Sequence, residues 1–207
     1  MATARTRSVG ILLFNGIEVL DLAGPYEVFT TATRVKQRQN PGVFPPFLVF
    51  TLAETLKPVK TRPGMEVIPQ FTIDEHPSMD MLIVPGGIVE DEMKNTRLLD
   101  WINENSRKTA VTASVCTGAF LLAAAGVLYE KTATTHWEDA KDLQARFPHV
   151  NVQPGKPWID NGSVVTSAGI SAGIKMSLHL VARLESKQLA TRTARQIEFD
   201  WKPEQPE

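Results

Sequence analysis

The sequence contains a single cysteine, Cys116, among 207 residues, so a disulfide-stabilised scaffold is excluded. It also lacks any apolar run close to the roughly 20 residues that a membrane-spanning helix needs. The net charge is −1 and no lysine or arginine cluster is longer than a pair, which leaves no electrostatic basis for binding nucleic acid or anionic lipid. We therefore expect the partner to be a small-molecule substrate or another protein. An unpaired cysteine suits a reducing compartment, so cytoplasm is the expected location.

The chain shows no composition shift, Pro/Ser-rich linker or internal repeat. Its length is ample for burying a hydrophobic core without covalent or metal crosslinks. We therefore expect one domain over residues 1–207.

Short apolar segments alternate with amphipathic segments of helical spacing. Strands are predicted at 8–14, 47–52, 81–84, 109–115, 150–153 and 158–166, and helices from about Pro25, at 98–108, 117–125, 138–147, 171–184 and 187–197. This alternation predicts an α/β fold with a mostly parallel sheet. Residues 58–72, interrupted by Arg62-Pro63-Gly64, predict an additional antiparallel hairpin, and Asn161-Gly162 predicts a second hairpin turn.

Residues with chemical potential follow three of the predicted strands. Asp21 follows the first, Gly86 and Gly87 follow a central one, and Cys116 follows another. Ligands of parallel α/β proteins bind beyond the carboxyl ends of the strands. We therefore expect these residues to meet in one pocket.

Cys116 lies between the apolar segment 111–115 and a helix of small residues that begins Thr117-Gly118-Ala119. This pattern is typical of a nucleophile elbow, a sharp turn that points the reactive side chain into a pocket. The helix N-terminus is expected to lower the thiol pKa below its free value of about 8.5. The alternative is that Cys116 is a small buried hydrophobic residue.

The glycines and the aspartate each have two interpretations. The backbone N–H groups of Gly86 and Gly87, with that of Thr117, could form an oxyanion hole, or the glycines could serve only a turn. Asp21, among apolar neighbours, could have a raised pKa and transfer a proton. It could instead be the N-cap of the helix that begins near Pro25.

Among the four histidines only His136, within Thr134-Thr135-His136-Trp137, is a candidate general base, and a structural role at a strand end is the alternative. The helical His179 is expected to be buried and hydrogen-bonded. No His/Cys/Asp set has the spacing of a zinc site, and no glycine motif of a dinucleotide site is present. We expect neither a metal nor another cofactor.

Five motifs in matching order resemble the ThiJ/PfpI (class I glutamine amidotransferase-like) superfamily. They are Leu20-Asp21-Leu22-Ala23-Gly24-Pro25, Val84-Pro85-Gly86-Gly87, Ser114-Val115-Cys116-Thr117-Gly118-Ala119, Ala133-Thr134-Thr135-His136-Trp137 and Ala168-Gly169-Ile170-Ser171-Ala172-Gly173-Ile174. Within it, the sequence is most similar to isocyanide hydratases and to the sensor half of certain AraC-type regulators. The resemblance implies a flavodoxin-like three-layer sandwich and a homodimer.

The resemblance also implies residue roles. Cys116 would be the nucleophile, Asp21 the acid that contacts its sulfur, and Thr117 a contact of that acid. The backbone around Gly86, Gly87, Gly169 and Ile170 would line the pocket. His136 and Trp137 are further pocket candidates, and Tyr26, Phe29, Val89 and Trp158 are other side chains that could shape the pocket.

Two departures narrow the implied function. Thr117 stands where the peptidase branch has His, and the glutaminase His-x-Glu signature is missing, so a protease triad is disfavoured. The resemblance therefore implies a lyase that adds water to an isocyanide and yields an N-substituted formamide. A glyoxalase/deglycase, an amidase-like enzyme and a small-molecule or redox sensor stay open. Because the sequence stops at Glu207, without the roughly 100 residues of a DNA-binding half, we expect no DNA contacts.

Overall fold

The computed structural model describes residues 5–202, which form a seven-stranded central sheet. The strand order is β10-β11-β7-β6-β1-β2-β5, and every neighbouring pair is parallel except β10 and β11. The strands are β1 (Arg7–Leu12), β2 (Phe47–Ala53), β5 (Phe71–Thr72), β6 (Met81–Val84), β7 (Val111–Val115), β10 (Trp158–Asp160) and β11 (Val164–Ser167). The predicted mostly parallel α/β sheet is confirmed.

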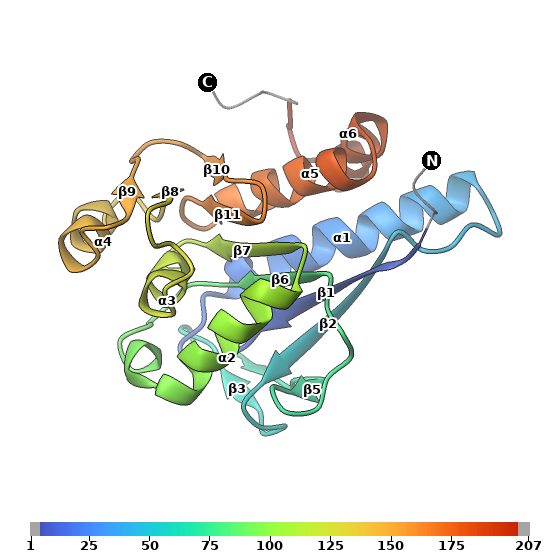
Figure 1. Cartoon of the computed structure of the whole chain (residues 1–207). Coiled ribbons are helices and arrows are strands. Elements are labelled where there is room, and N and C mark those ends of the chain that lie inside the picture. Colours follow the sequence, from blue (N-terminus) through green and yellow to red (C-terminus); the bar gives the residue numbers. More distant parts are fainter. Residues whose placement is uncertain (1–4, 203–207) are drawn as a thin grey trace.

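Helices cover both faces of this sheet (Figure 1). One layer holds α1 (Val19–Gln39), α5 (Ala172–Leu184) and α6 (Lys187–Gln196), which pack against one another. The opposite layer holds α2 (Thr96–Lys108), α3 (Gly118–Ala124) and the short helix η1 (Glu92–Lys94). The fold is thus a flavodoxin-like three-layer sandwich. None of the helices within residues 5–202 is both long and apolar enough to cross a membrane.

Burial explains the apolar central strands. Every residue of β6 and β7 is buried, as expected for parallel strands that helices cover on both faces. The α2 helix contributes Leu98 and Ile102 to the core, and the Asn95 side chain caps it by accepting a hydrogen bond from the Leu98 N–H (3.2 Å).

Two small sheets lie outside the main one. The predicted antiparallel hairpin is present as β3 (Val59–Lys60) and β4 (Glu66–Val67). The end of the predicted hairpin segment, residues 71–72, does not belong to this hairpin. It forms β5, which pairs in parallel with β2 at the edge of the main sheet. The second small sheet joins β8 (Thr132–Ala133) and β9 (Asn151–Val152) beside α4 (Ala140–Arg146).

The predicted start of the first helix is wrong. Helix α1 begins at Val19 rather than near Pro25, so Asp21 lies in its first turn and Glu18 is the N-cap. A long-range contact sets this start, because the Glu18 N–H donates to the Gly86 carbonyl (2.9 Å). Pro25 lies inside the helix and has no N–H to donate to the carbonyl of Asp21 four residues earlier.

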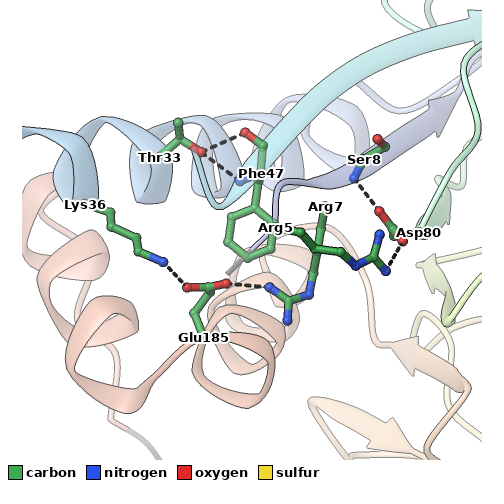
Figure 2. A network of polar contacts seen from close by, with 8 residues as sticks. All are labelled: Arg5, Arg7, Ser8, Thr33, Lys36, Phe47, Asp80 and Glu185. Atoms are coloured by element: carbon green, nitrogen blue, oxygen red, sulfur yellow. Dashed lines mark hydrogen bonds and ion pairs between the residues drawn. The ribbon is translucent and has the colours of Figure 1, made fainter. Parts of the chain in front are cut away.

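Polar contacts hold the amino-terminal ends of the strands, opposite the carboxyl ends where the site is expected (Figure 2). The Glu185 carboxylate bridges Arg7 of β1 and Lys36 of α1, at 2.5 Å to each. Asp80, just before β6, accepts from the Ser8 N–H at 2.9 Å. These contacts hold α1, β1 and the end of α5 together, leaving the carboxyl ends of the strands for the site.

Asp160 joins the antiparallel edge strand β10 to α5. His179 lies 2.7 Å from one Asp160 oxygen, and Arg183 contacts both oxygens at 2.6 and 2.7 Å. His179 is thus hydrogen-bonded, as predicted. It is only partly buried, however, and its ring stacks on Trp158. Burial acts to raise the pKa of Asp160, but the hydrogen bonds from His179 and Gly162 and the charge of Arg183 outweigh it and lower the pKa to about 2.

We predict that Asp160→Asn destabilises the protein by about 1–3 kcal/mol at pH 7, because hydrogen bonds to a charged group are lost. The folded pKa lies below the unfolded value of 3.8, so this stabilisation exists above about pH 4 and is lost as the pH falls toward 2. Urea unfolding at pH 7 and pH 3 measures it. Asp100→Asn, at an exposed position of α2, is the control, and an equal effect of both variants at pH 7 would contradict the assignment.

Candidate functional site

Cys116 occupies the turn between β7 and α3 in the left-handed backbone region, with φ = 55°. A non-glycine residue rarely adopts this region, and it occurs at strained functional turns. The Cys116 N–H donates to the Ser167 carbonyl at 3.2 Å, and the Cys116 carbonyl accepts from the Thr135 hydroxyl at 2.8 Å. The predicted elbow geometry is present, and neighbouring segments hold it on both sides.

Asp21 lies beneath this turn and is fully buried. Its Oδ2 accepts from the Gly86 N–H at 3.0 Å, whereas Oδ1 is buried and forms no full hydrogen bond. Burial raises the pKa of Asp21 to about 7, and a weak side-chain hydrogen bond with Cys116 is the smallest of the opposing influences. The predicted proximity of this carboxyl to the thiol is therefore present, and the carboxyl can exist with or without its proton at neutral pH.

The expected low pKa of the Cys116 thiol is wrong for the free protein. Burial raises the pKa of the thiol to about 12, and the charges of Asp21 and Asp139 add to this effect. The N–H groups of Thr117 and Ile170 act in the opposite direction by hydrogen bonding to the sulfur. Helix α3 has only seven residues, so its dipole does not overcome burial beside a carboxyl group.

The loop after β6 contacts the elbow through hydrogen bonds that sequence analysis did not assign. The Thr117 hydroxyl accepts from the Gly87 N–H (2.8 Å) and donates to the Gly87 carbonyl (2.9 Å). Thr117 therefore bonds to Gly87, whereas the resemblance implied a contact with Asp21. The N–H groups of Gly86 and Gly87 are already used by Asp21 and Thr117, so the predicted oxyanion hole at the two glycines is wrong.

Both turns need glycine because their backbones touch. A Cβ atom on Gly118 would lie 2.1 Å from the Val84 carbonyl oxygen, and one on Gly86 would lie 2.5 Å from the Thr117 backbone nitrogen. Real Cβ atoms do not approach backbone this closely. The absence of these two side chains lets the turn after β6 and the turn after β7 contact each other.

The opposite side of the site is built from the segment around His136 and from residues 169–170. His136 packs edge-on against Gly169, where a Cβ atom would lie 2.0 Å from the ring. Its Nδ1 lies 3.3 Å from Asp139 and 3.8 Å from Glu138. Ile170 has a positive φ of 47°, and its N–H faces the Cys116 sulfur.

A cavity of about 250 Å³ opens over Cys116. Of the predicted site residues, Cys116, Thr117, Gly87, Ile170 and His136 line it, whereas Asp21, Gly86 and Gly169 lie behind its wall. Trp137 does not line it and is 72% exposed. Val89, a candidate pocket residue, also lines it. Sequence analysis missed ten further lining residues: Glu18, Arg62, Ile88, Glu90, Met93, Phe120, Glu138, Asp139, Asp142 and Arg146.

Only some of these missed residues carried a local signal. Glu138 and Asp139 directly follow the motif that contains His136, and extending that motif would have found them. Arg62 stood in a predicted hairpin turn, and nothing in its surroundings links it to Cys116. Its place in the wall is set by tertiary contacts, including the hydrogen bond from its N–H to the Ile17 carbonyl (2.9 Å).

The resemblance to ThiJ/PfpI proteins implied this architecture, which combines a flavodoxin-like sheet, a buried cysteine at a strand-to-helix elbow and a carboxyl group beneath it. Comparison with known proteins agrees. The DJ-1/PfpI family model matches residues 7–183, so the chain belongs to this family.

Individual relatives include both enzymes and regulators. The chain is 33% identical to an isonitrile hydratase of Pseudomonas putida, over 92% of this chain and 78% of that protein. It is 27% identical to the HTH-type transcriptional regulator GbdR of Pseudomonas aeruginosa over 89% of this chain, but spans only 48% of the regulator. The crystal structure of a ThiJ/PfpI family protein from Pseudomonas syringae superposes with a TM-score of 0.83 at 25% identity, covering 98% of this chain and 78% of that one.

We predict that Asp21→Asn stabilises the protein at pH 8 by roughly 1–3 kcal/mol. The folded pKa of about 7 lies above the unfolded value of 3.8, so the destabilisation caused by Asp21 is absent below about pH 4, grows as the pH rises from 4 to 7, and is complete above pH 7. Asparagine retains an oxygen for the Gly86 N–H. Urea unfolding at pH 8 and pH 4 measures the difference, and a variant less stable than the wild type at pH 8 would overturn the prediction.

Proposed function

We propose that this protein is a cysteine-dependent isocyanide hydratase-like lyase that converts R–N≡C and water into the formamide R–NH–CHO. The observation that carries the proposal is the buried pair of Cys116 and Asp21, with Thr117 and not histidine following the cysteine. A carboxyl with a pKa of about 7 can both accept and donate a proton at neutral pH. The 33% identity to an isonitrile hydratase supports the same reaction.

In the first half of the reaction, the thiol proton moves to Asp21 and the sulfur adds to the terminal carbon of the isocyanide. Asp21 then gives this proton to the same carbon, which produces a thioimidate, R–N=CH–S. The N–H groups of Thr117 and Ile170 hydrogen bond to the sulfur and stabilise the negative charge that it carries before it adds.

In the second half, ionised Asp21 accepts a proton from water as the water oxygen adds to the thioimidate carbon. The proton passes to the substrate nitrogen, and the C–S bond breaks. The hydroxyl proton returns to the sulfur through Asp21, so the free thiol is restored. One water is consumed, and no oxidant or cofactor is needed.

The remaining contacts position this pair. Thr117 holds Gly87 through two hydrogen bonds, and Gly86 orients the Asp21 carboxyl by donating its N–H. We assign them positioning roles. The proposal includes a homodimer, which the resemblance implies and which light scattering would measure.

A sensor without turnover is the second candidate, because GbdR and the HTH-type regulator CdhR of Pseudomonas aeruginosa also match this chain. The two functions differ in outcome. A sensor would bind the small molecule and release it unchanged, whereas the proposed enzyme would release a formamide.

We predict that the purified protein converts an alkyl isocyanide into its formamide, followed by NMR. Cys116→Ala should lower kcat/KM by roughly 10³-fold or more, because the nucleophile is lost. Asp21→Asn should lower it by about 10²–10⁴-fold, because the amide cannot transfer the proton. Asp100→Asn should retain wild-type activity.

The same preparation should be incubated with methylglyoxal and with a peptide amide. Lactate from methylglyoxal, or ammonia from the amide, without formamide from the isocyanide, would move the protein to another branch of the family. Full activity of Cys116→Ala would refute the mechanism.

A further inference from the structure

The cavity over Cys116 has an acidic wall. Five carboxylates and two guanidinium groups line it, which gives a net charge of −3 with His136 neutral. The charged residues are Glu18, Glu90, Glu138, Asp139, Asp142, Arg62 and Arg146. The whole chain carries only −1, so negative charge is concentrated at this site.

Both arginines of the wall are already paired with carboxylates of the wall. Arg146 Nε lies 3.0 Å from Asp142, and its guanidinium lies over the Phe120 ring at 5.8 Å. Arg62 lies 3.8 Å from Glu18. These pairs leave little positive charge to attract an anionic substrate.

Three carboxylates of the wall have no lysine or arginine partner within residues 5–202. They belong to Glu90, Glu138 and Asp139, and the latter two contact only the His136 ring as an ion-pair partner. Glu90 and Glu138 are exposed at the cavity mouth. They are free to meet a positive charge that enters from solvent.

The field of one of these carboxylates, that of Asp139, extends to the reacting sulfur. The charge of Asp139 contributes to the raised pKa of the Cys116 thiol, so a group bound beside Asp139 lies within electrostatic range of the sulfur. Independently of this wall, the carboxyl of Asp21 lies behind the cavity lining and interacts with Cys116, and its fully buried Oδ1 has no full hydrogen bond. The Cys116 sulfur therefore lies between the acidic wall and an incompletely hydrogen-bonded carboxyl group.

We propose that the substrate carries a cationic group on R, held by Glu90, Glu138 and Asp139 while its isocyanide carbon faces Cys116. The proposal rests on the proposed function and names its substrate class. An anionic R group is repelled by the same wall. The attraction is electrostatic and partly exposed to solvent, so it weakens at high salt.

Three isocyanides of similar size test the proposal. They are 2-(trimethylammonio)ethyl isocyanide, its neutral carbon isostere 3,3-dimethylbutyl isocyanide, and 3-isocyanopropanoate. Because the first two differ in charge and hardly in shape, their kcat/KM ratio isolates the electrostatic contribution. We expect the cation to exceed the isostere by about tenfold at low ionic strength, a smaller ratio in 0.5 M salt, and the anion to be the poorest substrate.

The double variant E90Q/E138Q should lower the cation-to-isostere ratio several-fold. Both side chains are exposed, and the change keeps their size, so the fold is expected to tolerate it. Asp100→Asn removes a carboxylate outside the cavity wall and should leave the ratio unchanged. Equal kcat/KM for cation and isostere, or a ratio that the double variant does not change, would overturn the proposal.

The two proposals fail in different ways. If none of the three isocyanides is converted, the hydratase function is wrong, and calorimetry with the formamides of the cation and its isostere still measures the preference of the cavity. Tighter binding of the cationic formamide would support the acidic wall as a cation site. Equal or weaker binding would contradict it.

Discussion

The site depends on direct backbone contact between the turn after β6 and the turn after β7. Gly86 and Gly118 permit this contact, because a Cβ atom at either position would collide with the opposite backbone. The contact aims the Gly86 N–H at Asp21 and lets Thr117 bond to both polar groups of Gly87. It also connects the site to the start of α1, because the Gly86 carbonyl accepts from Glu18. The position of Asp21 beneath Cys116 follows from these bonds.

Patterns local in sequence predicted most of the fold. Apolar runs followed by glycine or small residues identified β6, β7 and the elbow at Cys116, and Asn161-Gly162 identified the turn between β10 and β11. Features set by distant contacts were missed. Pro25 indicated a helix start, but the bond between Glu18 and Gly86 begins α1 earlier. The predicted oxyanion hole required free N–H groups at Gly86 and Gly87. Sequence analysis missed their acceptors, Asp21 and Thr117, because both lie far away in the chain. The raised pKa of Cys116 was missed for the same reason, since its burial and its acidic neighbours are tertiary features.

Asp21 and Asp160 show how surroundings assign opposite roles to one residue type. Asp160 is held by His179, Arg183 and the Gly162 N–H, so its charge stabilises the join between β10 and α5. Asp21 has one backbone donor and a thiol neighbour, so its charge is poorly compensated. A fully paired carboxylate has little tendency to move a proton, whereas an incompletely paired one titrates near neutral pH. The group best suited to proton transfer is therefore one that reduces the stability of the fold.

The acidic wall and the raised pKa of the thiol belong to one electrostatic arrangement. In the free protein, burial together with the charges of Asp21 and Asp139 keeps the Cys116 thiol protonated, and a protonated thiol reacts slowly with oxidants and electrophiles. A cation bound beside Asp139 would offset one of these charges, and transfer of the thiol proton to Asp21 would remove the other. Only burial would then oppose ionisation of the thiol, so the thiolate would form more readily while a substrate occupies the cavity. Substrate charge would thus serve binding and activation together, because both act on the same carboxylates.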